Sequence, residues 1–414
     1  MPQPIARWIV RLKVATRLQS VVSWYLFSLM TESPKHTLSF AAAMSGLHRA
    51  QFSRLLSEHL DLAKASLLLL SQQIAMTISE CREVLVPGTS WRVLLIIDST
   101  LHRRSSLHVQ NSQRFNHGEG FVVGHQWTNI VLVINDRVIA LPPISFLSKN
   151  ECRRRGVIYK TEHQHIVEYL KDLRLGFWIG AHSTKEVVVL MDSGYDNKNI
   201  LKMIHGRGWD CVCALKTNRN TKTLASFENK ERKWHQVREL FRIVRKQAPW
   251  ITVRDIAGGG KMRKEFRARR LEGYLKGLTF LVALVCSEKS KGNGRKYLVC
   301  SNRDVSVRAI VLAYRKRWLI ELFHRAAKNN FGLQDAGVEG FNSLVSHVHW
   351  VYCAYLLIHE IEPGKQPGLE QRQRSLNTWL DGEPLRRVIQ LSTRYGDKDV
   401  ITKHCQEVLT EMSA

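Results

Sequence analysis

The sequence predicts a protein of the α/β class, in which a mixed sheet follows a helical region and is interrupted by a basic, β-rich insertion. Two apolar runs, Val93–Ile97 and Val187–Met191, are each followed directly by an aspartate. Helical patterns dominate residues 1–85 and return over 306–330. Between these helical segments, residues 216–276 hold 18 Lys and Arg against 6 Asp and Glu, a net charge of +12.

The composition is that of a globular protein with a polyanionic partner. The 414 residues are 44% hydrophobic, which supports a buried core and two or three domains and excludes a disordered chain. The formal net charge is +26, and a charge this large costs self-repulsion unless a polyanion is bound. The longest apolar stretch, Val21–Met30, is shorter than the roughly 20 residues that span a bilayer. Nucleic acid is therefore favoured as the partner, and no membrane is expected.

Residues 1–86 predict a helical region. Residues 5–30 fit one amphipathic helix with a basic face. Leu38–Ala43 and Phe52–Leu56 predict two short helices around Gly46, which fits a DNA-binding helix-turn-helix. An ordinary helical hairpin is an equally favoured interpretation of the same pattern. Pro87 and Gly88 end the helical pattern.

Residues 87–205 predict the first part of an α/β core. The expected elements, in order, are a buried strand at 93–97, a hairpin of strands at 130–134 and 138–141 joined by Asn135 and Asp136, a helix at 161–176, a second buried strand at 187–191 and a helix at 196–205. This order matches a mixed sheet of the ribonuclease-H-like kind.

The remaining segments divide by charge and pattern. Residues 206–295 predict the basic β-rich insertion, in which Gly258–Gly260 is expected to form a hairpin loop. Residues 296–360 predict the second part of the core, and 361–414 a C-terminal helical tail that could serve in dimerisation.

Asp98 and Asp192 occupy equivalent positions after the two apolar runs. If the two strands are neighbours in one sheet, both carboxylates lie at the same edge. Carboxylates gathered in this way are hard oxygen ligands suited to Mg²⁺ or Mn²⁺. Taken singly, either aspartate is more often a turn or helix-capping residue.

The helical pattern over 306–330 carries a narrow polar stripe. Tyr314, Arg317, Glu321 and Lys328 are separated by 3, 4 and 7 residues, which places them within about 60° on a helix with 3.6 residues per turn. Glu321 could complete a metal site with the two aspartates, and the other three side chains could bind phosphates. A surface helix with salt bridges along one face is the alternative.

These residues resemble the family four insertion-sequence transposases, a branch of the DDE transposases with a Tyr-Arg-Glu-Lys signature. The resemblance rests on Asp98-Ser99-Thr100, on Asp192-Ser193-Gly194 and on the fully matched spacing of the four-residue signature. It covers residues 90 to 360. Ser99 departs from the family, which often has a second aspartate there. The 128 residues between Asp192 and Glu321 leave room for the family's β-rich insertion.

The resemblance implies a bacterial, nucleoid-associated cytoplasmic enzyme that moves an insertion sequence by cut-and-paste transposition. Asp98, Asp192 and Glu321 would be the catalytic residues and would hold two Mg²⁺ or Mn²⁺ ions per active site. The expected reactions are end cleavage, a hairpin intermediate and strand transfer. The expected partners are double-stranded DNA, as terminal inverted repeats bound by the N-terminal region and as target, and a second copy of the chain in a synaptic homodimer.

Several further residues are expected to bind DNA. Tyr297 stands where the family has a tryptophan that stacks on a flipped base, although a tyrosine packed within the sheet is equally expected. Trp234 and Trp250 are competing candidates for that role. Arg267, Arg269 and Arg270 form the densest basic run of the insertion.

Two other functions fit the same residues. A ribonuclease-H-like nuclease without strand transfer would use the same three acids. A non-catalytic basic DNA-binding protein would keep its activity when the acids are mutated.

Overall fold

The computed structural model describes residues 3–12, 14–104, 109–117, 120–229, 232–244, 248–256, 262–289, 294–360 and 368–381. The chain divides into two compact units. Unit 1 comprises the described residues of Met1–Leu62, Ala327–Val338 and Asn342–Ala414, and unit 2 comprises those of Ala63–Ala326 and Glu339–Phe341. The predicted loop at Gly258–Gly260 and most of the predicted tail lie outside the described residues.

Unit 1 is helical. Its elements are α1 (Gln3–Arg11), α2 (Thr16–Met30), α3 (Leu38–Ser45), α4 (Arg49–Glu58), most of α14 (Phe341–Ile358) and α15 (Leu369–Asp381), and it also holds the start of α5 (Leu60–Ser79). The single helix predicted over 5–30 is therefore wrong. No Gly or Pro marks the break, and residues 21–30 are largely buried, so packing within the unit determines the division. The hydroxyl of Tyr25 on α2 lies 2.7 Å from Nδ1 of His347 on α14.

The predicted pair of short helices is present in unit 1. Thr37 caps the start of α3 by accepting a hydrogen bond from the Phe40 amide. Gly46 ends that helix with a φ of 68°, a left-handed conformation that favours glycine. The α4 helix begins three residues later. The cap at Thr37 and the turn at Gly46 thus define α3 and separate it from α4. That this pair of helices binds DNA stays a prediction.

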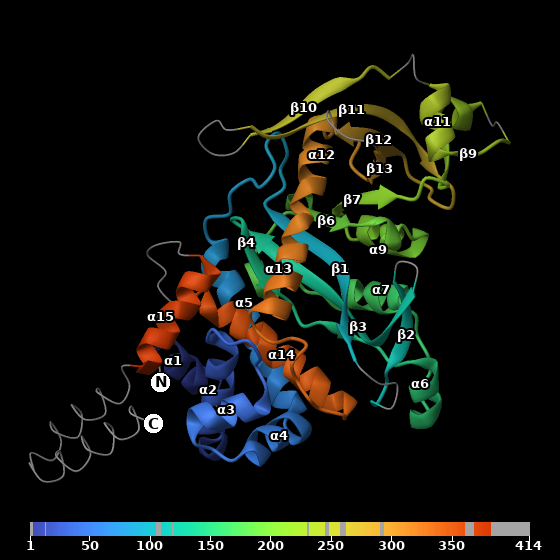
Figure 1. The fold of residues 1–414 in the computed structure, drawn as a ribbon. Coiled ribbons are helices and arrows are strands. Elements are labelled where there is room, and N and C mark those ends of the chain that lie inside the picture. Colours follow the sequence, from blue (N-terminus) through green and yellow to red (C-terminus); the bar gives the residue numbers. More distant parts are fainter. Residues whose placement is uncertain are drawn as a thin grey trace, which may run out of the picture. The chain divides into compact units, whose positions relative to one another are not determined.

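Unit 2 is built on one large mixed sheet (Figure 1). Its hydrogen-bonded order is β2-β3-β1-β6-β7-β13-β12-β11-β8-β9, with β4 and β5 pairing β3 and β10 pairing β11. The core strands are β1 (Val93–Arg103), β2 (Gln113–His117), β3 (Gly120–Ile134), β4 (Arg137–Ala140), β5 (Ile144–Ser145), β6 (Val187–Met191) and β7 (Asp210–Leu215). The strands of the insertion and its return are β8 (Asn220–Thr223), β9 (His235–Gln236), β10 (Ile251–Ile256), β11 (Met262–Leu275), β12 (Val282–Lys289) and β13 (Arg295–Cys300).

Helices connect and cover these strands. They are α6 (Lys149–Arg155), α7 (Glu162–Asp172), α8 (Gly176–Ile179), α9 (Lys198–Gly206), α10 (Leu224–Glu228), α11 (Val237–Ile243), α12 (Val307–Lys316) and α13 (Trp318–Asn329), with short 3₁₀ turns η1 (Thr184–Glu186) and η2 (Ser193–Tyr195). Figure 1 shows α12 and α13, in orange, running in front of β1. Residues 327–329, the end of α13, belong to unit 1.

The predicted mixed sheet is confirmed. β1 pairs with β6 in parallel through Val93 to Ile97, and β6 pairs in parallel with β7. All five residues of β6 are buried, as expected of a strand covered on both faces. The hairpin between β3 and β4 turns at Asn135 and Asp136, whose φ values of 50° and 59° are those of a type I′ turn.

Two predicted boundaries are wrong at positions that matter for the site. β1 does not end before Asp98 but continues to Arg103, because β3 pairs with it along the whole length. The helix predicted over 306–330 is divided at Arg317, between α12 and α13. The amide of Arg317 bonds the carbonyl of Tyr314, three residues back, which tightens the backbone at this point.

Candidate active site

The two aspartates lie at the edge where the parallel pairing of β1 with β6 ends. Parallel pairing of β1 with β6 ends at Ile97 opposite Met191, so Asp98 and Asp192 occupy the next position on each strand. Asp98 stays within β1, opposite Asn129 of β3. Asp192 follows the end of β6 and caps η2, accepting a hydrogen bond from the Gly194 amide at 2.7 Å. The predicted juxtaposition therefore follows from strand order and register.

Arg317 joins the helix to this edge. Its Nη1 donates to Oδ2 of Asp98 at 2.8 Å, and its Nη2 donates to Oε1 of Glu321 at 3.1 Å. The Arg317 side chain is 14% exposed. Because the guanidinium is a planar fork, one side chain can hold two carboxylates at defined positions. Arg317 thus couples the end of α12 and the first turn of α13 to β1.

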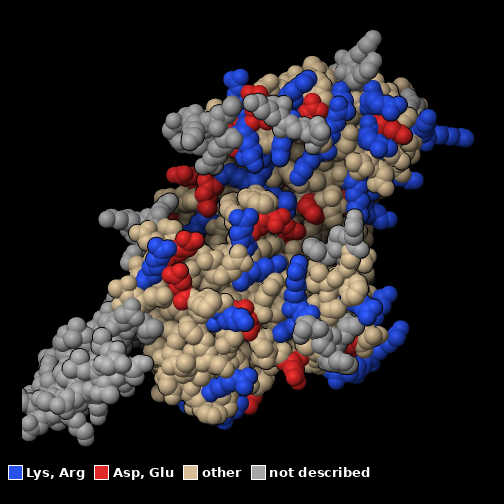
Figure 2. All heavy atoms as spheres, in the orientation of Figure 1, with Lys and Arg blue, Asp and Glu red and all other residues tan. Residues whose placement is uncertain are grey.

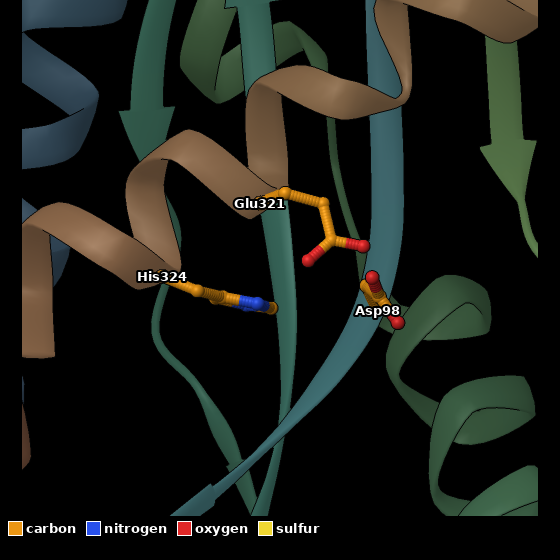
Figure 3. A group of neighbouring side chains, drawn as sticks. All are labelled: Asp98, Glu321 and His324. Carbon is orange, nitrogen blue, oxygen red and sulfur yellow. The ribbon is translucent and has the colours of Figure 1, made fainter.

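A histidine that the sequence analysis missed completes the group. Ligand atoms of Asp98, Glu321 and His324 all lie within 4.8 Å of one another. In Figure 3 the carboxylates of Asp98 and Glu321 face each other, and the His324 ring reaches from α13 toward the same space. The amide nitrogen of Asn129 donates to Nε2 of His324 at 2.9 Å. The spacing Glu-x-x-His on one helix face was the signal available in the sequence.

Asp192 is not part of that three-residue group among the described residues. Its charge nevertheless acts on the same site, because it contributes to raising the pKa of Asp98 and that of Tyr314. Asp192 therefore lies within electrostatic reach of the group while one of its oxygens caps η2.

The charge balance of the site favours binding of a cation. Burial raises the pKa of Asp98 to about 6, the nearby Arg317 opposes that rise, and repulsion from Asp192 and Glu321 adds to it. Two carboxylates thus share one guanidinium in a partly buried space, and the charge of a third acts on Asp98. Carboxylate oxygens are the ligands that Mg²⁺ and Mn²⁺ prefer, and imidazole nitrogen also suits Mn²⁺. The residues present therefore fit a divalent metal.

The raised pKa predicts how stability depends on pH without metal. The protonated form of Asp98 favours the folded state, so its contribution is complete below about pH 4 and is lost as pH rises through about 6. In EDTA, Asp98→Asn should melt a few degrees above the wild type near pH 7.5, and the difference should shrink toward about pH 5. Thermal unfolding at both pH values checks this. An equal difference in melting temperature at both pH values would show that the charge of Asp98 does not destabilise the folded state.

Tyr314 and a lysine that was not predicted lie within electrostatic reach of the carboxylates. Tyr314 lies one turn before Arg317 on α12, and the Lys296 ammonium lies 5.3 Å from the centre of its ring. Burial, followed by repulsion from Arg317, lowers the pKa of Lys296, whereas Asp192 raises it. Lys296, which the sequence analysis missed, therefore brings a second cation to the site. Lys328 lies in the last turn of α13, within unit 1.

A partly buried polar network joins the start of α7 to β3 and η2. The hydroxyls of Thr128 and Tyr195 donate to Oε1 of Glu162 at 2.6 and 2.9 Å, and the Gln126 amide donates to Oε2 at 3.0 Å. Thr128 pairs with Ser99, the residue after Asp98. Glu162 thus ties the start of α7 to the strands that carry the site.

The predicted DNA-binding residues of the insertion differ in accessibility. Arg267 is 51% exposed and lies near Glu288. Arg269 is 5% exposed and donates to the Phe241 carbonyl. Arg270 bonds Glu272 and the Arg303 carbonyl. Figure 2 shows many Lys and Arg side chains over the region of the insertion strands.

Tyr297 is 4% exposed, and its ring packs against Phe241 with centroids 5.8 Å apart. A base could reach this ring only if its neighbours moved. Trp250 is half-buried between arginines, with Arg269 and Arg267 at 4.7 and 5.2 Å from its centroid. The Lys222 ammonium lies 4.8 Å from the centroid of Trp234. The stacking role stays a prediction for all three aromatic residues.

A mixed sheet that gathers carboxylates at one edge, with a helix adding a glutamate across it, defines a metal-dependent enzyme of phosphoryl transfer. The family model of the transposase DDE domain matches residues 92–357. The chain belongs to this family, so it is a DDE transposase that acts on DNA. The search of curated proteins found no match to the chain. Within the described residues, no helix is both long and apolar enough to cross a membrane.

Proposed function

We propose that this protein catalyses cut-and-paste transposition of an insertion sequence of family four. The observation that carries the proposal is the bridge from Arg317 to Asp98 and Glu321. It joins the signature helix to the sheet edge, where Asp192 follows the neighbouring strand. In the alternative interpretation, a surface helix stabilised by salt bridges along its own face would not require an ion pair with a carboxylate of the sheet.

We propose that Asp98, Asp192 and Glu321 hold two Mg²⁺ or Mn²⁺ ions, with His324 as a fourth ligand. The clustered ligand atoms and the raised pKa of Asp98 support this assignment. When bound, such ions activate an oxygen nucleophile and stabilise the leaving oxygen of a phosphodiester. Asp192 would give up its cap on η2 to serve as a ligand.

The chain's own cations would position the DNA. Arg317 donates hydrogen bonds to Asp98 and Glu321. It is also one of the signature residues predicted to contact phosphate. Lys296 and the Tyr314 hydroxyl lie beside it and offer further donors to phosphate oxygens. Lys328 of the signature would bind phosphate farther along the helix.

The proposed reaction is a series of phosphoryl transfers. Water first attacks a phosphodiester at the end of the element and releases a 3′-OH. That 3′-OH attacks the opposite strand, which forms a hairpin and frees the element from the flanking DNA. Water reopens the hairpin, and the restored 3′-OH attacks the target strand and displaces its 3′ oxygen. Each step exchanges one phosphorus–oxygen bond for another, so no covalent enzyme–DNA bond is needed. A synaptic homodimer would hold both ends.

The test is a strand-cleavage assay. Purified full-length protein is incubated with duplex DNA carrying the ends of the element and with Mg²⁺ or Mn²⁺, and the products are separated on denaturing gels. Nicks, hairpins and joined target strands are expected in that order. Nicks without joined strands would indicate a nuclease instead, and unchanged DNA would contradict an enzymatic role.

His324 provides a sharper test of the metal site. We expect His324→Ala to weaken Mn²⁺ binding by roughly 10–100-fold, because a ligand is lost. Mg²⁺ binding should fall less, since imidazole suits Mn²⁺ better than Mg²⁺. Calorimetric titration of the metal-free protein with each ion measures both effects.

His235→Ala is the matched control, because this half-buried histidine of β9 lies in the insertion of the same unit. It should bind both ions like the wild type. Equal Mn²⁺ affinity in the wild type and in a folded His324→Ala variant would remove His324 from the ligand set.

A further inference from the structure

A cationic cavity lies where the segments that follow β6, β7 and β11 come together. Its volume is about 310 Å³. It is lined by Asp196, Lys216, Asn218, Arg219, Asn220 and Lys276. Three cations and one carboxylate therefore face the cavity, together with two amide side chains. A net positive, hydrogen-bonding cavity is chemically suited to an anion rather than to an apolar ligand.

Backbone hydrogen bonds fix the walls of the cavity. The turn after β7 is closed by the Arg219 amide, which donates to the Lys216 carbonyl at 2.9 Å. The Lys276 amide donates to the Asn220 carbonyl at 3.0 Å, next to the pairing of Leu275 with Thr221 between β11 and β8. Lysines 60 residues apart in the sequence are thus held at one site by the sheet itself.

The carboxylate of the cavity forms its ion pair with the arginine and not with either lysine. Asp196, whose side chain is 2% exposed, pairs with Arg219 at 3.2 Å. Burial raises the pKa of Asp196, and the charges of Arg219 and Lys216 oppose the rise. Among the described residues, no carboxylate forms an ion pair with Lys216 or Lys276. The buried Nη2 of Arg219 has no hydrogen-bond acceptor there.

The cavity lies at the same sheet edge as the catalytic aspartates. Lys216 is the first residue after β7, and Asp196 follows Asp192 by four residues after β6. The two strands are parallel neighbours, with Met191 opposite Cys213. A DNA strand with one phosphate at the carboxylates would bring another phosphate of its backbone within reach of this cavity.

We propose that this cavity binds a phosphodiester of the DNA substrate through Lys216, Arg219 and Lys276. The inference rests on the proposed function and adds a positioning site for the strand beside the one being cut. A free phosphate or nucleotide presents the same tetrahedral anion. We assign the site to DNA because both lysines are exposed and lie at the two ends of the basic segment 216–276.

The test compares Lys216→Ala/Lys276→Ala with wild-type protein. Both lysines are exposed, so the double variant should fold. Binding to a labelled duplex of about 30 base pairs is measured by fluorescence anisotropy in EDTA over a range of salt, because phosphate contacts are independent of sequence. The variant should bind roughly tenfold more weakly near 0.1 M salt, and the slope of log K against log salt should be smaller by about 1–2.

Lys171→Ala/Lys185→Ala is the matched control. It removes the same charge from exposed positions of unit 2, in the last turn of α7 and in η1, before β6 begins. Its salt slope should stay within about 0.5 of the wild-type value. If both double variants lowered the slope equally, the cavity would have no specific role and the proposal would be overturned.

A second measurement separates the two sources of phosphate. Inorganic phosphate is added at constant ionic strength, and the melting temperature is recorded, because a ligand of the folded state raises it. Stabilisation of the wild type but not of Lys216→Ala/Lys276→Ala, with DNA binding unchanged in that variant, would assign the site to free phosphate and overturn the DNA proposal.

The cleavage assay on the same proteins separates this proposal from the proposed function. If the wild type cuts DNA and Lys216→Ala/Lys276→Ala keeps the wild-type affinity and salt slope, the cavity assignment alone is overturned. If the wild type does not cut DNA and Lys216→Ala/Lys276→Ala shows the smaller salt slope, the cavity assignment is supported and the proposed reaction is overturned.

Discussion

Replacing Glu321 with glutamine is expected to lower the rate of DNA cleavage by roughly a thousandfold or more, because activation of the nucleophile by metal is lost. Glutamine keeps the size of the side chain and can still accept a hydrogen bond from Arg317, so the bridge to Asp98 can persist. What it removes is the negative charge that offsets the divalent ions. DNA binding should survive or tighten, since one charge that repels phosphate is gone.

Glu339→Gln is the control for this change. Glu339 is exposed, belongs to the same unit and lies away from α13. Asp98→Asn and Asp192→Asn should reproduce the Glu321→Gln result, and combinations should be far from additive because the three act as one unit. Rates of strand cleavage and anisotropy of bound DNA measure the two effects separately. If Glu321→Gln cut DNA at nearly the wild-type rate, the catalytic assignment would be wrong.

Salt should weaken DNA binding by roughly a thousandfold or more between about 50 and 200 mM, because a protein that contacts six or more phosphates releases their counterions. The formal charge of +26, with +12 over residues 216–276, is the basis for this expectation. Anisotropy titrations at several salt concentrations give the slope directly. A change of less than about tenfold would contradict the electrostatic role assigned to the insertion.

Two arginines of the basic run, Arg267 and Arg269, must be tested differently. Arg267→Glu reverses an exposed charge and should weaken binding to all sequences alike. A loss confined to the cognate end would instead indicate that Arg267 reads bases. Charge reversal at Arg269 would bury a carboxylate beside the Phe241 carbonyl and destabilise the fold. Its effect on binding would therefore carry no information about DNA contact.

Local chemistry made several elements predictable. Asn135 and Asp136 tolerate positive φ, so the type I′ turn and its hairpin follow from two residues. The apolar runs before Asp98 and Asp192 predicted two buried strands, since a strand covered on both faces reads as a continuous apolar run. The spacing of Tyr314, Arg317 and Glu321 placed them on one helix face, although the helix divides at Arg317.

Contacts between distant segments could not be read from local patterns. The pairing of β3 with β1 continues beyond Asp98, which keeps that carboxylate within a strand. Arg267 and Arg269 are alternate residues of one strand, and chemically identical side chains became exposed and buried respectively. The break between α1 and α2 has no Gly or Pro to mark it. Each of these outcomes depends on which distant segment of the chain packs against the residue.

Residue type and short-range periodicity were enough to predict the class of fold, the carboxylates of the candidate site and a charge that favours a polyanionic partner. The assembly of the site became visible in the folded chain alone. The tertiary structure showed that Arg317 bridges Asp98 and Glu321, that His324 joins them and that Lys216 and Lys276 share one cavity. Strand register and helix packing bring these groups together across long stretches of chain, and neither quantity is encoded in the spacing of neighbouring residues.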